Sequence, residues 1–302
     1  TIDPNNPYEL TEDERAVMNS LSASIINSER LQTHIRYMFS HGALYKRING
    51  NLLFHGCIPM DENGDFLPVD IYGAKCAGRA LMEHLDKQIR ASYFSPEKIK
   101  KYGKPGDLMW YLWLAKDSPL FGKEKMTTFE RLFIDDKASH KEHVRPYYKL
   151  INSKEPCEKI LREFGLDPSH SKILNGHVPV KIKNGESPIK GGGLLYVIDG
   201  GISKAYQKQT GIAGYTFIFN SRFMALAEHK PYEPLKEDGT QKFFSPSMKT
   251  VDTLKTRMLV IDTDEGAELL RQAEAVKRLV EAYKTGEIKE RPEGKYSAYK
   301  GK

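Results

Sequence analysis

Cysteine is scarce in this 302-residue chain. Its three cysteines, Cys57, Cys76 and Cys157, are odd in number, and none belongs to a C-x-x-C pair. Zinc ribbons are built from such pairs, so the sequence supports no site of that kind. The pattern is typical of a protein of the reduced cytoplasm, where thiols are kept unpaired.

Long apolar runs are also absent. No run approaches the roughly 18 residues that a bilayer crossing needs, so we predict no membrane partner. The first ten residues are polar and contain two prolines, unlike a signal peptide. With 39% hydrophobic and 28% charged residues, the composition is that of an ordinary globular protein with one large domain or two smaller ones.

Charge of one sign does not dominate either. The net charge is +6, and the basic residues are interleaved with 40 acidic ones. A nucleic-acid binder more often concentrates its cations on one stripe, so we predict no nucleic-acid partner. A mild positive bias also suits a small anionic substrate, because a basic cleft concentrates such ions. Charge alone does not choose between these classes.

Helical signals fill the first half of the chain. Thr11 and Glu14 form a capping box, and apolar residues from Val17 to Phe39 follow at helical spacing until Gly42. We predict one long packing helix there. Because no strand precedes it, we expect the chain to begin in the middle of a fold. Further predicted elements are a buried strand at 51–54, a helix at 77–89, an aromatic core segment at 107–133 that contains both tryptophans, and a helix at 156–164.

Strands dominate the second half. We predict strands at 173–174, 194–198 and 215–219, a hairpin partner at 223–227, and a late strand at 257–261. The three glycines at 191–193 precede a strand and lack a Gly-Lys-Ser/Thr ending, so they indicate a turn and not a nucleotide loop. Thr263 is predicted to cap a final amphipathic helix that ends at Gly286.

Two histidines stand out by position. His55 follows a predicted strand and precedes Gly56, and His177 follows another within Asn175-Gly176-His177-Val178-Pro179. Residues at strand ends face the crevice where α/β proteins bind ligands. A neutral imidazole there is a good ligand for a divalent ion. The alternative is a hydrogen-bonded structural histidine, and position alone leaves both open.

The two histidine segments resemble the last two histidine motifs of the calcineurin-like metallophosphoesterases. Longer runs resemble one family of that superfamily, the class III fructose-1,6-bisphosphatases, over essentially the whole chain. These runs are Ser118 to Gly122, Met126 to Arg131, Asn175 to Lys181, Gly191 to Gly201 and Gly211 to Asn220. The resemblance implies hydrolysis of fructose 1,6-bisphosphate to fructose 6-phosphate and phosphate, a step of gluconeogenesis.

The sequence departs from the superfamily pattern in one respect. The three earlier motifs, Asp-x-His, Gly-Asp-x-x-Asp-Arg and Gly-Asn-His-Asp/Glu, do not occur. We expect them to lie upstream of Thr1, which would make this chain a C-terminal portion with a missing N-terminal half as partner. On its own, such a fragment is expected to be inactive, with no catalytic residue assigned in it.

The resemblance also implies a ligand set. His55 and His177 would bind the same Mn²⁺ or Mg²⁺ ion of a dinuclear site. Pro179 stands where many relatives have a further histidine for the second ion. Two such ions hold the phosphate oxygens and lower the pKa of a bridging water that attacks phosphorus in line.

Residues around these motifs are weaker candidates. Asp199 is a candidate hydrogen-bond partner of a ligating histidine, or else a strand-end aspartate that caps a turn. The cations that would bind the substrate phosphates are Lys181, Lys204, Lys190 and Arg222, each of which also fits a solvated surface role.

The sequence therefore predicts an α/β fold: part of a metallophosphatase-type β-sandwich flanked by helices, with a helical insertion. The predicted division is a helical segment at 1–50, the C-terminal half of the phosphatase domain at 51–230 with the insertion at about 72–170, and a strand and helix at 231–302 that complete it. The alternatives are another metallophosphoesterase, acting on proteins or dinucleoside polyphosphates, or a non-catalytic module. Association into a homo-oligomer is left open.

Overall fold

The computed structural model describes residues 5–6, 8–96, 104–201, 203–212, 214–231 and 246–289, without the side chains of 104–106 and 204–206. Its contacts divide the chain into two compact units, one of residues 1–46 and 54–165 and the other of residues 47–53 and 166–302. The polar loop expected around Asp238 and the tail beyond residue 289 lie outside the described residues.

The first unit begins with two helices where we expected one. α1 spans Glu12–Ile26, and its capping box is confirmed: Glu14 N donates to Thr11 Oγ1 at 3.3 Å, and Thr11 N donates to Glu14 Oε2 at 2.9 Å. α2 spans Glu29–His41 and has its own cap, because Ser28 Oγ accepts from Leu31 N at 3.4 Å. The prediction of one continuous helix was wrong, since the Ser28 cap restarts the hydrogen-bond ladder.

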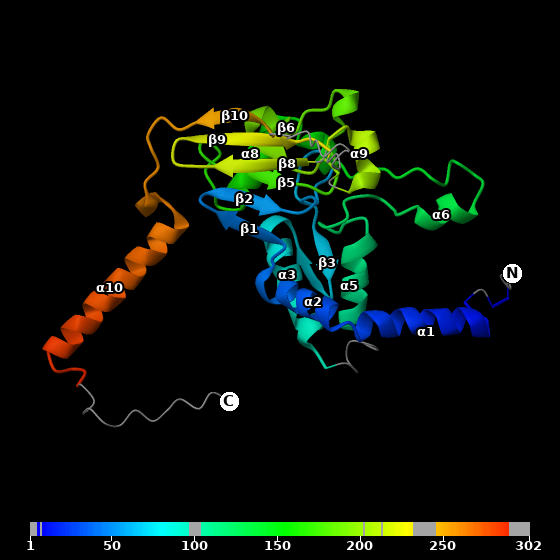
Figure 1. The fold of residues 1–302 in the computed structure, drawn as a ribbon, viewed down its shortest axis with the longest axis horizontal. Coiled ribbons are helices and arrows are strands. Elements are labelled where there is room, and N and C mark those ends of the chain that lie inside the picture. The colour runs from blue at the N-terminus through cyan, green and yellow to red at the C-terminus, as the bar shows by residue number, and fades with distance from the viewer. Residues whose placement is uncertain are drawn as a thin grey trace, which may run out of the picture. The chain divides into compact units, whose positions relative to one another are not determined.

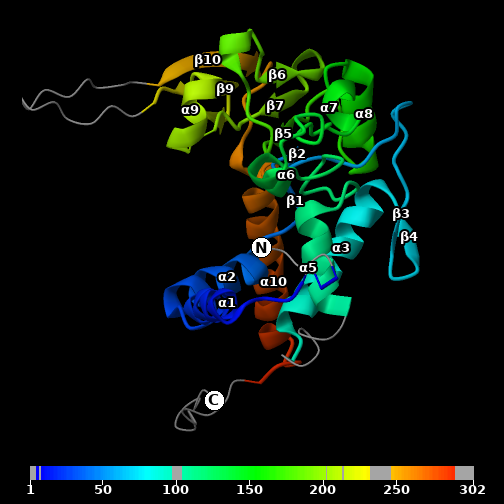
Figure 2. The same cartoon turned by 90° about the vertical axis from the view of Figure 1, so that its right-hand side faces the viewer.

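Five helices and one β-hairpin are described in the rest of this unit (Figure 2). α3 packs against both α5 and α8, and its buried Leu81 and Leu85 contribute to the core. α8 ends where Gly165 adopts a φ of 69°, a left-handed conformation that favours glycine. The elements are the hairpin β3 (Val69–Ile71) and β4 (Ala74–Cys76), α3 (Gly78–Phe94), α5 (Lys104–Leu114), α6 (Thr128–Phe133), α7 (Tyr147–Leu150) and α8 (Lys154–Glu163).

The two tryptophans do not pack in the core as expected. Trp110 and Trp113 lie three residues apart on α5 and are 65% and 68% exposed. Among the side chains of this helix that the structure describes, the buried ones are Leu108 and Leu112, each 2% exposed. The aromatic composition of the segment was therefore a poor guide to which face of the helix is buried.

A five-stranded sheet runs in the order β1-β2-β5-β7-β6. Figure 1 labels β1, β2, β5 and β6, and Figure 2 labels all five strands. β5 pairs in parallel with β2 on one side and with β7 on the other, while β6 pairs antiparallel with β7. Buried Leu52, Ile173 and Leu195 lie in register across its centre. The strands are β1 (Tyr45–Ile48), β2 (Asn51–Phe54), β5 (Ile173–Asn175), β6 (Ile189–Lys190) and β7 (Leu195–Val197).

A second sheet is antiparallel, in the order β10-β9-β8. β8 (Gly214–Phe219) and β9 (Phe223–His229) form the predicted hairpin. β10 (Ser247–Thr253) was not predicted, because most of its side chains are exposed and its sequence has no clear apolar alternation. An ion pair of 2.7 Å joins its Asp252 to the nearly buried Lys172.

The remaining elements are the 3₁₀ turns η1 (Ile182–Asn184), η2 (Gly191–Gly193) and η3 (Val260–Asp262), and the helices α9 (Lys204–Thr210) and α10 (Asp264–Lys284). The late strand predicted at 257–261 was wrong, because its last residues enter η3 instead. The cap of α10 is confirmed by the 3.1 Å bond from Gly266 N to Thr263 Oγ1. The structure is thus of the predicted α/β class, with one mixed and two small antiparallel sheets.

Candidate functional site

His55 lies immediately beyond β2, and its side chain is exposed. The turn that starts at Ser118 holds the next two residues in place. Cys57 N donates to Pro119 O at 2.9 Å, and a Cβ added to Gly56 would lie only 2.5 Å from that same oxygen. The run from Ser118 to Gly122 is therefore the support of the His55 segment. The sequence marked it as a family signature but did not indicate this role.

Cys57 is the thiol nearest to His55 in the sequence, and its environment argues against a nucleophilic role. It is 2% exposed, and its Sγ donates to Ser118 O at 3.8 Å. Burial raises its pKa to about 12, with Arg145 and Asp117 adding smaller opposing effects. Since the thiolate is the reactive form, this cysteine is inert at neutral pH.

His177 occupies a strained turn. Its φ is 67°, and the turn closes with a 2.8 Å hydrogen bond from Val178 N to Gly176 O. This bond between residues two apart, centred on a positive φ, defines a classic γ-turn, which is rare in proteins. A non-glycine residue held in this conformation costs free energy, and such strain clusters at functional sites.

The end of β7 anchors the loop that follows His177. Val180 N donates to Asp199 O at 2.9 Å, and Ile198 N donates to Asn175 O at 2.9 Å. The Asp199 carboxylate itself caps a turn, because its Oδ1 accepts from Gly201 N at 2.8 Å. Asp199 is thus bonded through its backbone to the loop that carries His177.

The strand registers place the strand ends that precede these segments at one edge of the sheet. Leu53 pairs with Leu174 and Asn175 pairs with Val197, all in parallel. The carboxyl ends of β2, β5 and β7 therefore lie at the same edge, and the residues that follow these strands are His55, His177 and Asp199. In the part of the chain that the structure describes, no group of three His, Cys, Asp or Glu side chains could hold a metal ion.

The predicted phosphate-binding cations do not all lie at this edge. Lys181 follows the His177 loop directly and is exposed. Lys190 pairs with Leu195, at the amino end of β7. Arg222 lies in the turn after the carboxyl end of β8. The amino end of β8 is the one near β7, because Tyr215 N donates to Ile198 O, directly after β7, at 3.1 Å. The Lys204 side chain is outside the described residues.

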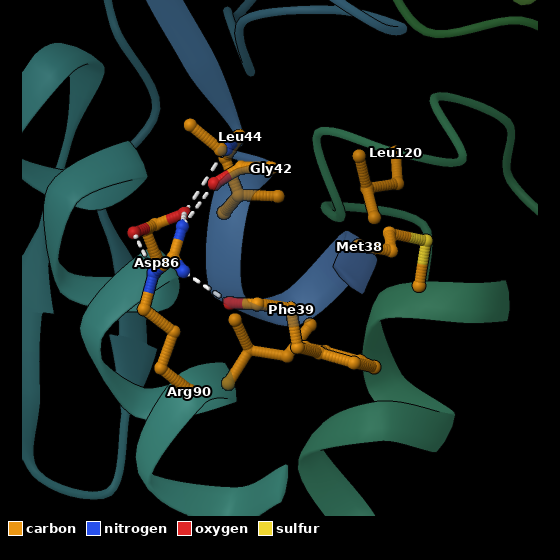
Figure 3. A pocket seen from close by; sticks show the side chains of 9 residues that line it. Met38, Phe39, Gly42, Leu44, Asp86, Arg90 and Leu120 are labelled. Atoms are coloured by element: carbon orange, nitrogen blue, oxygen red, sulfur yellow. Dashed lines mark hydrogen bonds and ion pairs between the residues drawn. The ribbon is translucent and has the colours of Figure 1, made fainter. Parts of the chain in front are cut away.

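A pocket of about 210 Å³ lies elsewhere, in the first unit (Figure 3). Its lining is mainly apolar, and its charges are already paired. Arg90 donates to the carbonyl oxygens of Phe39 and Gly42, and its Nε lies 2.8 Å from Asp86 Oδ2. Asp86 also accepts from Leu44 N at 3.1 Å. Arg90 therefore satisfies backbone carbonyls at the end of α2 and is not available for a phosphate.

Taken together, the mixed five-stranded sheet, the small antiparallel sheets and the helices define a protein of the α/β class. The family model described as "Firmicute fructose-1,6-bisphosphatase" matches residues 1–285. The chain belongs to this fructose-1,6-bisphosphatase family, as the resemblance in its sequence predicted. No helix among the described residues has both the length and the apolar character that a membrane crossing requires.

Curated relatives carry the name "Fructose-1,6-bisphosphatase class 3". The chain is 50% identical over 295 residues to that of Clostridium botulinum (strain Alaska E43 / Type E3), covering 96% of this chain and 44% of the relative. It is 49% identical over 294 residues to that of Clostridium tetani, covering 96% and 44%, and 47% identical over 292 residues to that of Fusobacterium nucleatum, covering 96% and 45%. The chain thus spans less than half the length of these relatives. No solved structure matches it.

Proposed function

We propose that this chain is part of a cytoplasmic enzyme of gluconeogenesis that hydrolyses the 1-phosphate of fructose 1,6-bisphosphate. The family match over residues 1–285 supports the substrate and the reaction. Within this proposal, His55 and His177 bind one divalent ion, and the chain supplies the last two histidine motifs of a dinuclear site.

The observation that carries the ligand assignment is the shared sheet edge. β2 and β5 are adjacent and parallel, and a histidine follows each of them. Exposed His55 rests on the Ser118 turn, and His177 is held in a strained γ-turn. Two such rigid supports suit ligands whose nitrogens must be fixed before the ion arrives.

The donor set fits Mn²⁺ or Mg²⁺ only in part. Imidazole nitrogen suits Mn²⁺, and Mg²⁺ prefers oxygen, so the histidines favour manganese. When bound, a pair of such ions stabilises the charge on phosphate oxygens and supplies a hydroxide-like nucleophile. Among the described residues, no group of three His, Cys, Asp or Glu side chains could hold a metal ion, so in this proposal the remaining ligands and the bridging carboxylate come from elsewhere in the enzyme.

Other residues have supporting roles in the proposal. Asp199 holds the His177 loop through its backbone, because its carbonyl oxygen accepts a hydrogen bond from Val180 N. In this proposal, Asp199 positions His177 only through that bond. Lys181, which follows the loop, is placed better than Lys190 or Arg222 to attract a substrate phosphate. The five-stranded sheet would form part of a metallophosphatase β-sandwich, and the three-part division at residues 50 and 230 belongs to the same proposal.

A non-catalytic role is the alternative for the chain when it is isolated. The incomplete donor set favours it, because an ion held by two imidazoles and otherwise by water binds weakly. Another metallophosphoesterase activity is disfavoured by the family match.

The test is phosphate release from fructose 1,6-bisphosphate with Mn²⁺ present. The turnover number of the isolated chain should be at least about a hundred-fold below about 1 per second, which is the low end of the range for ordinary enzymes. Supplying the part of the Clostridium tetani relative that the chain does not span should restore Mn²⁺-dependent release. In that restored enzyme, His55→Ala or His177→Ala should abolish most of the activity, whereas His143→Ala, at an exposed histidine on a different segment, should not. Ordinary turnover by the isolated chain would contradict the partial-site proposal.

A further inference from the structure

η3 and the helix that follows it expose an unusual amount of apolar surface. Leu259, Val260 and Ile261 are 57%, 65% and 56% exposed. Along α10, the only buried residue among those described is Gly266, and six large apolar side chains are 44–59% exposed: Leu269, Leu270, Val276, Leu279, Val280 and Tyr283. We call these nine side chains the η3–α10 face.

The exposed apolar residues of α10 form a single stripe. Leu269, Ala273, Val276, Val280 and Tyr283 follow one another at intervals of four and three, which places them on the same side of a helix. Leu270 and Leu279 widen that stripe on either side. Such a wide apolar stripe is typical of a helix that packs against another surface.

α10 is held firmly at its start. Asn49 N donates to Asp264 Oδ2 at 2.7 Å, and Asp264 N donates to Asn49 Oδ1 at 3.1 Å. Gly266 lies so close to η3 that a Cβ there would be 1.8 Å from Val260 O. Beyond this anchor, the remaining turns show no buried side chain among the described residues. Helices of this kind draw most of their stability from packing of the apolar stripe, so the face requires a cover.

The comparisons indicate what that cover is. The family match ends at residue 285, so α10 belongs to the family and is not an appended tail. Relatives match 96% of this chain and yet continue over more than half of their own length outside it. We propose that the η3–α10 face is the docking surface for the portion of the class 3 enzyme that this chain does not span.

A second copy of the chain is a poorer occupant. In a parallel pair of α10 helices, the flanking positions would bring Lys277 and Lys284 beside Gln272 and Leu279, with no opposite charges. In an antiparallel pair, the flank that carries the two lysines would face itself, which is unfavourable. The lysines instead suit a mainly apolar partner with an acidic border on that side.

The test uses this chain and, as a separate polypeptide, the portion of the Clostridium tetani relative that it does not span. Val276→Glu places a charge in the stripe, and Ala275→Glu makes the same change in charge one residue away on another side of the helix. Both variants introduce glutamate, which has a high helix propensity, so circular dichroism should show unchanged helix content. Sedimentation of mixtures, without Mn²⁺ or substrate, gives the dissociation constants.

We expect the chain and its A275E variant to bind the separate portion, and V276E to bind at least about ten-fold more weakly. Hydrogen exchange of α10 amides should slow on binding, while exchange in α3 stays the same. If V276E bound the separate portion as tightly as A275E does, the proposal would be overturned. It would also be overturned if the unchanged chain bound that portion neither in the mixture nor when the two are co-expressed. A homodimer broken by V276E and not displaced by the portion would identify a second copy as the occupant. Slow exchange in α10 of the chain alone would mean that its own residues cover the face. Because no arm measures phosphate release, these outcomes are separate from those of the proposed function.

Discussion

His177 combines a candidate ligand with a backbone conformation that disfavours it. The imidazole can be tested for metal binding, and the backbone can be tested separately by comparing two variants that both lack the ring. Glycine adopts a φ of 67° without strain, whereas alanine carries the same Cβ penalty as histidine.

We predict that His177→Gly is more stable than His177→Ala by about 1 kcal/mol. Urea denaturation of the two variants measures the difference. Because both lose every imidazole contact, the difference reports the strain of the γ-turn less the extra backbone entropy that glycine has in the unfolded chain. Equal stabilities would show that the strain is no larger than this entropy, and the strain argument for a functional position would fail.

Glu142 is the carboxylate with the most strongly shifted pKa among the described acids. Burial by itself would raise this pKa, but hydrogen bonds from Lys123 and Thr127 outweigh burial and lower it to about 2 from 4.5. Lys123 Nζ lies 2.8 Å from Glu142 Oε2, and Thr127 N donates to Oε1 at 3.1 Å. These bonds join the residues before α6 to Glu142, which follows α6.

A carboxyl group whose pKa is lower in the folded than in the unfolded state stabilises the protein when the pH is above the unfolded-state pKa. This stabilisation is lost as the pH falls through the folded-state pKa. Glu142→Gln should therefore lower the free energy of unfolding by about 2 kcal/mol at pH 7. The deficit should shrink between about pH 4.5 and pH 2, where the native carboxylate becomes protonated. Denaturant titrations at several pH values measure it. Glu124→Gln, at an exposed carboxylate of the same segment, is the control and should change little. A deficit that stays constant as the pH falls would refute the assignment.

At the scale of elements, the junction of η3 and α10 requires glycine at position 266, because a residue with a Cβ would clash there. Replacement of a helical glycine by alanine ordinarily stabilises a protein by about 1 kcal/mol. Gly266→Ala should have the opposite sign here, because the new Cβ would lie 1.8 Å from Val260 O. We expect a loss of at least about 2 kcal/mol at this junction, seen as faster hydrogen exchange at the start of α10. Ala267→Gly is the comparison and should cost only about 1 kcal/mol. A stabilising Gly266→Ala would show that η3 and α10 are not in contact.

Elements whose signals are local were predicted well from the sequence. The capping box of α1, the β8–β9 hairpin and the end of the last helix near Gly286 all depend on hydrogen bonds and torsions within a few residues. The late strand was wrong because an apolar run indicates burial without saying what buries it. Its Leu259, Val260 and Ile261 are exposed in a 3₁₀ turn region.

For the whole molecule, the exposure of large apolar side chains on several helices has a measurable consequence. Besides the η3–α10 face, Met18 and Leu21 of α1 and both tryptophans of α5 are more than half exposed. We predict that the isolated chain, with its helix content intact, binds the dye ANS several-fold more strongly per mole than the whole Clostridium tetani relative does. Fluorescence titration measures this. Equal dye binding by the two proteins would mean that these surfaces are not covered in the longer enzyme.

The sequence by itself determined the family and the α/β class, because these reside in contiguous motifs and local periodicity. Only the tertiary structure decided that the Ser118 turn supports His55, that a γ-turn constrains His177, and that β2, β5 and β7 end at one edge. It also decided that Trp110 and Trp113 are exposed. The physical reason is that strand register and burial depend on contacts between residues far apart in the chain, which composition and spacing do not encode.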